Sequence, residues 1–523
     1  MAGPILTAPP GAPRLADWPG LVPSVWLSVR TGVVAGLVSL GLTVLLLAAL
    51  ATGRGLGWLR RMLSPLLALP HAAAALGLAF LIAPSGWVAR MLSPWATGWT
   101  APPDALILND PGGWSLIAGL VAKEVPFLLL MGLAALPQTR AAQAGLLAAA
   151  LGYGRIWGFL LTVWPAVWPQ LRLPMAAVLA YGMTTVDMGR ILGPGLPPPL
   201  GVQVVVWAMQ PDPVWHVPAA EGAALLMALV ALVLGVLRLA EALPARAGRA
   251  LARAGWRGAG AEGALRGLAV AAGGTLGVTM AAAMAGLAVW SVAGPWRFPQ
   301  AWPQALSLAH WARALPELAE ATRATVAIAV LSTAAALALA LGWLAAGGGR
   351  QGRAMAALVY LPLILPQPVF LPGLQVLALR AGLDGSLLAV AAVHLVFVLP
   401  YVILSLAGPW AAWDDRLAMA AAGLGAGPAR VFWRLRLPML LAPLATAAAV
   451  GVAVSVAQYL PTLLIGAGRI ATLTTEAVAL SSGQNRRLIG IWAGVQAVLP
   501  AATFALAMAL PAAVWRNRRG MRP

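Results

Sequence analysis

The chain has 523 residues, of which 61% are hydrophobic and only 9% charged, and its mean hydropathy is +0.85. A soluble domain carries about 25% charged residues, so this composition excludes a soluble globular protein and predicts one surrounded mostly by lipid. The absence of cysteine excludes disulfides, thiolate metal sites and a cysteine nucleophile. The net charge of +19 is carried by arginines between apolar segments, which the positive-inside rule explains better than a nucleic-acid surface.

A helix that crosses a membrane needs about 20 apolar residues. Segments of this kind follow one another along the whole chain, so we expect an all-α, multi-pass membrane protein with about eleven transmembrane helices. The expected spans are 25–50, 66–89, 114–136, 168–192, 219–242, 267–292, 322–346, 354–379, 386–408, 441–466 and 488–514.

A basic linker, residues 246–266, separates the first half of the chain, residues 1–245, from the second half, residues 267–523. Placing this linker in the cytoplasm puts every other basic cluster there as well, as the positive-inside rule requires. These clusters are Arg54, Arg60 and Arg61; Arg350 and Arg353; and Arg516, Arg518, Arg519 and Arg522. The second half opens with a span, 267–292, that has no partner in the first half. We therefore expect the first half to lack this helix and its N-terminus to face outward.

One loop occurs twice, at about 140–165 and about 414–438. The shared residues are Gly152, Gly154, Phe159 and Pro165 in the first copy and Gly425, Gly427, Phe432 and Pro438 in the second, and all four pairs are the same distance apart in the sequence. An Ala-rich helical run precedes each glycine, the glycines allow a sharp turn, and the proline suits the first turn of the next helix. The repeat predicts two similar modules. Each would present a helix-turn-helix at the cytoplasmic face, with the phenylalanine as an apolar knob for a partner.

The second copy resembles the EAA loop of permease subunits in binding-protein-dependent ABC importers. Its matching residues are Ala420, Ala421, Gly425, Leu435, Leu437 and Pro438, and those of the weaker first copy are Ala148, Gly152, Thr162, Trp164 and Pro165. Both copies lack the glutamate of the family pattern, and Leu146 and Met419 stand at its position.

The resemblance implies two tandem MetI-like permease modules in a bacterial inner membrane. It extends to the fused permeases of iron(III) and thiamine importers, and the runs 123–129 and 186–194 are most similar to the YnjC type. It also implies two copies of an ABC ATPase subunit, which bind ATP and magnesium themselves, and a periplasmic solute-binding protein. The coupling residues would be Ala148, Gly152, Phe159, Pro165, Ala420, Ala421, Gly425, Phe432, Leu437 and Pro438. The only lysine, Lys123, follows no glycine-rich loop, so the chain lacks the Walker A motif of an ATPase.

Charged side chains at membrane depth cost about 2.5–3.5 kcal/mol each and invite a functional interpretation. Glu124 and Asp187 are candidate carboxylates of a pathway for a cationic solute, with Thr184 and Thr185 as neighbouring polar groups. The alternatives are a local pair of Glu124 with Lys123 and an i,i+3 pair of Asp187 with Arg190. His71 and His394 are expected to be packed side chains rather than metal ligands, because no Asp, Glu or Cys stands at ligand spacing.

Two other classes of protein remain to be considered. A secondary transporter can also be built from internal repeats. A membrane-embedded enzyme is disfavoured, because the spans hold no paired carboxylates at helical spacing and the chain has no H-E-x-x-H or G-x-S-x-G motif. We therefore expect no catalytic residues, no metal site and no cofactor bound by this chain itself.

Overall fold

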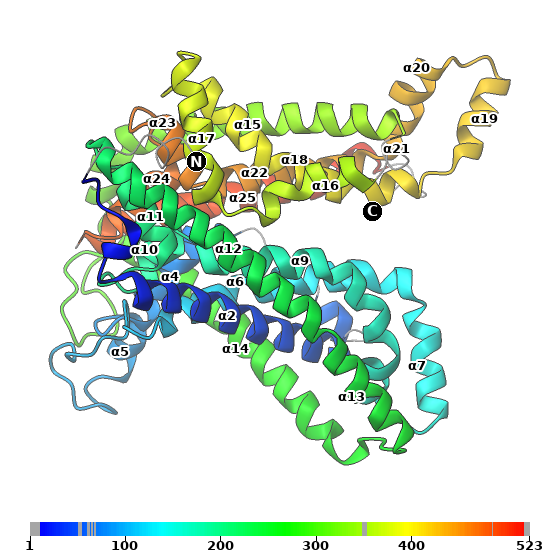
Figure 1. Ribbon diagram of the computed structural model, residues 1–523, viewed down its shortest axis with the longest axis horizontal. Helices are drawn as coiled ribbons and strands as arrows, with labels where there is room; N and C mark the ends of the chain where they lie inside the picture. The colour runs from blue at the N-terminus through cyan, green and yellow to red at the C-terminus, as the bar shows by residue number, and fades with distance from the viewer. Residues whose placement is uncertain are drawn as a thin grey trace.

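The computed structural model describes residues 11–50, 55–59, 63, 66, 69–347, 353–483 and 485–516. Within these ranges the regular structure is helical apart from one isolated β-bridge between Ala293 and Leu306. Long helices lie side by side along the horizontal axis of Figure 1, with short helices and loops at both ends. The expected all-α membrane fold is therefore confirmed.

Each expected span contains a helix, but fewer of these helices cross a membrane by length and composition alone. In the described part of the chain, eight helices qualify, or ten if two bent pairs each count as one span. One pair bends by 117° between Ile364 and Gln367, and the other by 74° between Met439 and Leu441. The span expected at 168–192 corresponds to α9 (Trp164–Thr184), whose first half carries Gln170 and Arg172.

Apart from the short helix α5, the helices of the first half have counterparts in the second half in the same order. The first half comprises α2 (Leu21–Leu50), α4 (His71–Ile82), α5 (Trp87–Leu92), α6 (Trp114–Ala135), α7 (Ala141–Ala150), α8 (Arg155–Gly158), α9, α10 (Asp187–Leu192), α11 (Leu200–Ala208) and α12 (His216–Ala240). The second half comprises α15 (Ala309–Ala345), α16 (Arg353–Ile364), α17 (Gln367–Arg380), α18 (Leu387–Ala411), α19 (Asp415–Gly423), α20 (Pro428–Val431), α21 (Leu437–Met439), α22 (Leu441–Ala457), α23 (Leu460–Gly466), α24 (Leu473–Leu480) and α25 (Arg486–Val514).

Packing repeats along with the helix order. Helix α2 packs against α6 and α9, as α15 packs against α18 and α22, and α11 packs against α12 as α24 does against α25. The α2–α9 crossing is close because Gly32 faces Gly182, and a Cβ at Gly32 would lie 2.6 Å from the backbone nitrogen of Met183. Such small-residue contacts are how membrane helices approach one another.

Two helices between the halves have no counterpart in this order. Helix α13 (Ala242–Arg253) and the start of α14 (Glu262–Ser291) occupy the region expected to be the linker. Helix α14 then packs against α25 of the second half and against α4 and α2 of the first, and Figure 1 shows it beside α2. This helix contains the span expected at 267–292, which has no equivalent in the first half.

Both repeated loops lie at one end of the molecule. Figure 1 shows α7, α13, α19 and α20 at one end, whereas α5, α10, α23 and α24 lie at the opposite end. This arrangement agrees with the placement of the linker and both loops on one side of the membrane. Arg54, Arg60, Arg61, Arg350, Arg518, Arg519 and Arg522 lie outside the described residues.

Candidate functional site

The two repeated loops adopt the same turn. In loop 1 (residues 141–165) Gly152 has φ +79°, and the N–H of Tyr153 donates to the Ala148 carbonyl at 3.0 Å. In loop 2 (residues 415–438) Gly425 has φ +81°, and the N–H of Ala426 donates to the Ala421 carbonyl at 3.0 Å. Both are helix-ending Schellman motifs, in which glycine adopts the left-handed conformation at little cost.

The return from each turn also repeats. A short helix follows each turn, then a five-residue π-helical segment, Phe159–Val163 in loop 1 and Phe432–Arg436 in loop 2. Pro165 and Pro438 come just after these segments and lack the N–H that would close an α-helical bond four residues back. The wider π turn accommodates this lost bond, so the proline that the sequence identified shapes the return helix.

The two phenylalanines, predicted as apolar contacts for a partner, are partly buried and pack against the rest of this chain. Phe159 packs against two apolar clusters of the first half. Phe432 packs with Trp410 and Leu437, and its ring centroid lies 6.2 Å from that of Trp410. Each ring anchors the return helix to its own half, because apolar partners from that half lie beside it. Ala148 is buried as well.

Several exposed apolar side chains of the loops were not among the predicted coupling residues. Leu146 and Leu151 are exposed on loop 1, and Met419 and Leu424 are exposed on loop 2, where Leu424 is 90% accessible. These residues pair at the same spacing as Gly152 and Gly425, and Leu146 and Met419 are those that replace the glutamate of the family pattern. The constant spacing of the repeat was the signal that could have found them.

Loop 1 is held from the side by the segment between the halves. The Glu262 carboxylate accepts hydrogen bonds from the backbone N–H of Ile156 at 2.9 Å and of Trp157 at 3.3 Å. The Arg257 guanidinium donates to the Tyr153 hydroxyl at 2.9 Å and lies 4.4 Å from the centre of its ring. We call this set of contacts the linker clamp.

Aromatic packing completes the linker clamp. The rings of Trp157 and Trp256 meet edge to face, with centroids 4.3 Å apart. Gly258, at φ +66°, lies directly under the Trp157 ring, where a Cβ would come within 2.0 Å of it. Loop 2 is not held from the side in this way at the equivalent position. A Cβ added at Gly427, the counterpart of Gly154, would meet no atom within 4 Å among the described residues.

A polar cluster lies inside the first half, where α9 breaks before α10. Asp187 Oδ1 accepts hydrogen bonds from the Tyr181 hydroxyl at 3.1 Å and the Thr185 hydroxyl at 3.0 Å. The Tyr181 ring lies 4.7 Å from the His71 ring, and His71 Nε2 lies 4.0 Å from Glu124 Oε1. The structure thus brings together Glu124, Thr185 and Asp187, three of the four predicted pathway residues, through two aromatic rings.

Thr184, the fourth predicted pathway residue, is not hydrogen-bonded to the cluster, and neither alternative pairing forms among the described residues. Thr184 donates to the Ala180 carbonyl of its own helix. Lys123 donates to the Leu66 and Leu69 carbonyls rather than pairing with Glu124, so it satisfies backbone acceptors ahead of Pro70. Arg190 does not pair with Asp187 within the described ion pairs, and its guanidinium donates instead to the Tyr459 hydroxyl at 2.7 Å.

The Arg190–Tyr459 bond joins the two halves at equivalent breaks. Tyr459 stands in the second half between α22 and α23, as Val186 stands between α9 and α10, and these two residues have the same spacing as Gly152 and Gly425. Next to Tyr459, the Gln367 amide nitrogen lies 3.5 Å from the Gln458 amide oxygen. Polar groups therefore gather where broken helices of both halves meet, which is where irregular backbone is tolerated in membranes.

His394 is buried, as expected for a packed histidine, and both of its ring nitrogens have hydrogen-bond partners. Its ring nitrogens lie 2.9 Å from the Ser455 hydroxyl and 2.9 Å from the Thr462 hydroxyl. His71 instead faces Glu124 in the polar cluster. Among the described residues, no three His, Cys, Asp or Glu side chains are placed to hold a metal ion.

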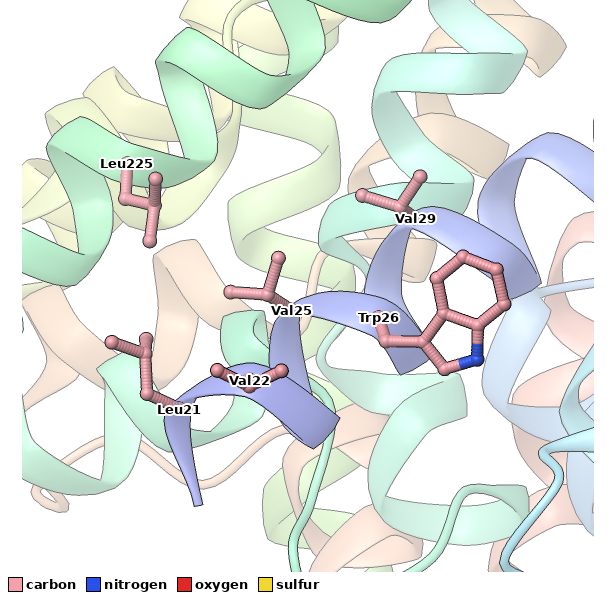
Figure 2. A pocket seen from close by; sticks show the side chains of 6 residues that line it. All are labelled: Leu21, Val22, Val25, Trp26, Val29 and Leu225. Atoms are coloured by element: carbon pink, nitrogen blue, oxygen red, sulfur yellow. The ribbon is translucent and has the colours of Figure 1, made fainter. Parts of the chain in front are cut away.

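One open hollow on the surface is not part of this polar cluster. Figure 2 shows it between α2 and α12, and its lining residues are Leu21, Val22, Val25, Trp26, Val29 and Leu225. The lining is apolar and largely open to the outside, with Val22 and Trp26 exposed. It suits a lipid chain rather than a polar solute.

Repeated membrane-spanning helices, paired helix-turn-helix loops at one end and polar groups where the halves meet are typical of a transport protein. Comparison with known proteins specifies the class. Residues 338–515 match the family described as "Binding-protein-dependent transport system inner membrane component". The chain is also 32% identical over 483 residues to the inner membrane ABC transporter permease protein YnjC of Escherichia coli K12, covering 92% of this chain and 87% of that protein.

A more distant similarity involves a shorter relative. The molybdenum transport system permease protein ModB, from Mycobacterium bovis and from Mycobacterium tuberculosis, is 29% identical over 184 residues, or 33% of this chain and 68% of that protein. The chain belongs to the family of inner-membrane permeases of binding-protein-dependent ABC transporters. The resemblance seen in the loops is thus confirmed.

Proposed function

We propose that this chain forms the solute pathway of an ATP-driven importer and couples two ABC ATPase subunits to a periplasmic solute-binding protein. The observation that supports the proposal is the pair of matching turns at one end of the molecule, each exposing apolar side chains near a partly buried phenylalanine. The ATPase subunits would bind ATP and magnesium, because this chain has no Walker A motif. The solute-binding protein would dock at the opposite end.

Transport in proteoliposomes tests this proposal. We expect uptake only when the ATPase subunits, ATP and the solute-loaded binding protein are all present. Omitting the ATPase subunits is the matched control. Uptake that persists with an ion gradient alone, without ATP or ATPase, would establish the secondary transporter instead.

For the solute, we propose a small cation, with thiamine as the first candidate. Two carboxylates, Glu124 and Asp187, stand in the polar cluster beside the aromatic rings of Tyr181 and His71. Carboxylates attract a cation, and aromatic faces bind organic cations favourably. Iron(III) is the inorganic cation to compare, whereas molybdate, the kind of solute suggested by the name of ModB, is an anion and matches these carboxylates less well.

Neutral variants of the two carboxylates test this choice of solute. Asp187→Asn and Glu124→Gln keep side-chain size but remove the charge, so we expect each to lower kcat/KM for the cationic solute by at least about tenfold. Glu221→Gln is the control, because Glu221 pairs with Arg14 away from the cluster. ATPase binding should be the same in all variants. Unchanged uptake of thiamine and iron(III) by both variants would rule out a carboxylate pathway.

A further inference from the structure

Two arginines on the return of loop 2 are replaced by apolar residues in loop 1. Arg430 and Arg434 are exposed, and neither takes part in an ion pair among the described residues. At the constant spacing of the repeat, their counterparts in loop 1 are Trp157 and Leu161. The two loops by themselves would therefore offer surfaces of different charge.

The segment between the halves covers both of these apolar positions of loop 1. The ring of Trp157 packs edge to face against that of Trp256. A Cβ at Gly248 of α13 would lie 3.4 Å from Cδ2 of Leu161, so α13 packs against the return of loop 1. Trp157 and Leu161 are both partly buried. The part of loop 1 that corresponds to the arginines of loop 2 is thus occupied by the segment between the halves.

This segment carries arginines of its own on the side away from loop 1. Residues 242–261 contain four arginines and no acidic residue, and one of the four, Arg257, belongs to the linker clamp. The other three are exposed, stand at i, i+3 and i+7, and form what we call the basic face of α13: Arg246, Arg249 and Arg253. At 3.6 residues per turn, this face lies about 130° around the helix from Gly248. It is therefore free of the packing against loop 1.

The length of the helix places the basic face of α13 beyond the bilayer. Helices α12 and α13 belong to one nearly continuous helix of 41 residues, Pro213–Arg253, which is about 61 Å long at 1.5 Å per residue. A bilayer with its headgroups is about 40–45 Å thick. Trp215 stands at the start of this helix, and tryptophan favours the headgroup level. Helix α13 therefore projects past the opposite headgroups, at the end of the molecule where α7 of loop 1 also lies (Figure 1).

We propose that the basic face of α13 binds an acidic surface of the ATPase subunit that docks on loop 1, and that Arg430 and Arg434 bind the same acidic surface of the subunit on loop 2. This inference rests on the function proposed above. Two identical subunits need similar surfaces beside both loops, and the chain supplies positive charge beside each loop from a different segment. Arginine suits this use, because its planar guanidinium binds a carboxylate through two hydrogen bonds.

Charge reversal on α13 tests the proposal. The variant combines Arg246→Glu, Arg249→Glu and Arg253→Glu, and the permease is placed in nanodiscs of zwitterionic phosphatidylcholine. We expect its affinity for the purified ATPase to fall at least about tenfold at low ionic strength, because attraction across the interface becomes repulsion. Salt should weaken binding of the wild type more than binding of the variant. On loop 2, Arg430→Glu combined with Arg434→Glu should cause a loss of similar size.

The matched control makes the same change of charge away from both loops. It reverses three exposed arginines: Arg297→Glu, Arg313→Glu and Arg380→Glu. This control should bind the ATPase as the wild type does. Equal affinity of the wild type and the α13 variant would overturn the proposal. An effect of the α13 variant that appears only when phosphatidylglycerol is added to the nanodiscs would also overturn it, because the arginines would then bind lipid.

Site-specific crosslinking gives a second measurement, and the absence of native cysteine makes single labelling clean. A photocrosslinker attached to Arg249→Cys is expected to join the ATPase subunit, whereas one attached to Arg380→Cys is not. Adducts of Arg249→Cys to lipid alone would contradict the proposal, even if the ATPase binds normally. A wild-type permease that binds no ATPase at all would instead contradict the function proposed above, so the two failures can be told apart.

Discussion

Leu424→Asp is expected to reduce binding of the ATPase subunit by at least about 30-fold and to lower ATP-driven uptake accordingly. Leu424 is 90% exposed at the tip of loop 2, so the change disturbs little within the chain itself. A charge buried without a partner in an apolar interface costs about 2 kcal/mol or more, which corresponds to this loss of affinity. The measurement is co-purification of the ATPase with the permease, together with its dissociation constant.

Leu424→Met is the matched control, because it keeps an apolar side chain of similar size and should bind the ATPase normally. Phe432 is a poorer test position. It packs against Trp410, so replacing it disturbs loop 2 before it disturbs any partner. Normal co-purification of Leu424→Asp with the ATPase would show that the exposed apolar side chains of loop 2 are not the docking surface.

Glu262→Ala is expected to loosen loop 1 by about 2 kcal/mol. The change removes the carboxylate that accepts from the backbone N–H groups of Ile156 and Trp157, and hydrogen bonds to charged groups contribute about 1.5–3 kcal/mol each. Opening of loop 1 should then rise about 30-fold. The measurement is the rate of tryptic cleavage between Arg155 and Ile156 in purified protein, which follows the population of the open form.

Glu320→Ala is the control for this experiment, because Glu320 lies on α15, far along the chain from the linker clamp. Glu262→Gln should fall between the wild type and Glu262→Ala, since an amide oxygen still accepts but carries no charge. Equal cleavage rates for the wild type and Glu262→Ala would mean that the linker clamp does not hold loop 1.

Sequence reasoning succeeded where the signal was local or repeated. The spans follow from runs of apolar residues, and the turn at Gly152 and Gly425 follows from glycine conformation and the constant spacing of the repeat. The unmatched helix between the halves was also visible, because the repeat left it without a counterpart. In each case the residues that determine the structure are close in sequence or recur at a fixed distance.

The features that could not be predicted from the sequence are contacts between residues far apart in the chain. The inward direction of Phe432 depends on Trp410, and the role of Lys123 depends on carbonyl groups ahead of Pro70. The linker clamp joins residues distant in sequence, such as Tyr153 and Arg257, and no described contact of loop 2 repeats it. The Arg190–Tyr459 bond is of the same kind, because it forms only when the halves meet.

Helix α14 has a mechanical consequence for the transport cycle. Its first residue, Glu262, is fixed to loop 1, and near its other end the Leu287 carbonyl and Ser291 lie against Gly490 of α25. If an ATPase subunit acts on loop 1 as proposed, α14, which is about 45 Å long, would connect that movement to α25 in the other half. The proposed coupling would therefore differ between the halves, because among the described residues no helix makes an equivalent connection from loop 2 to the first half.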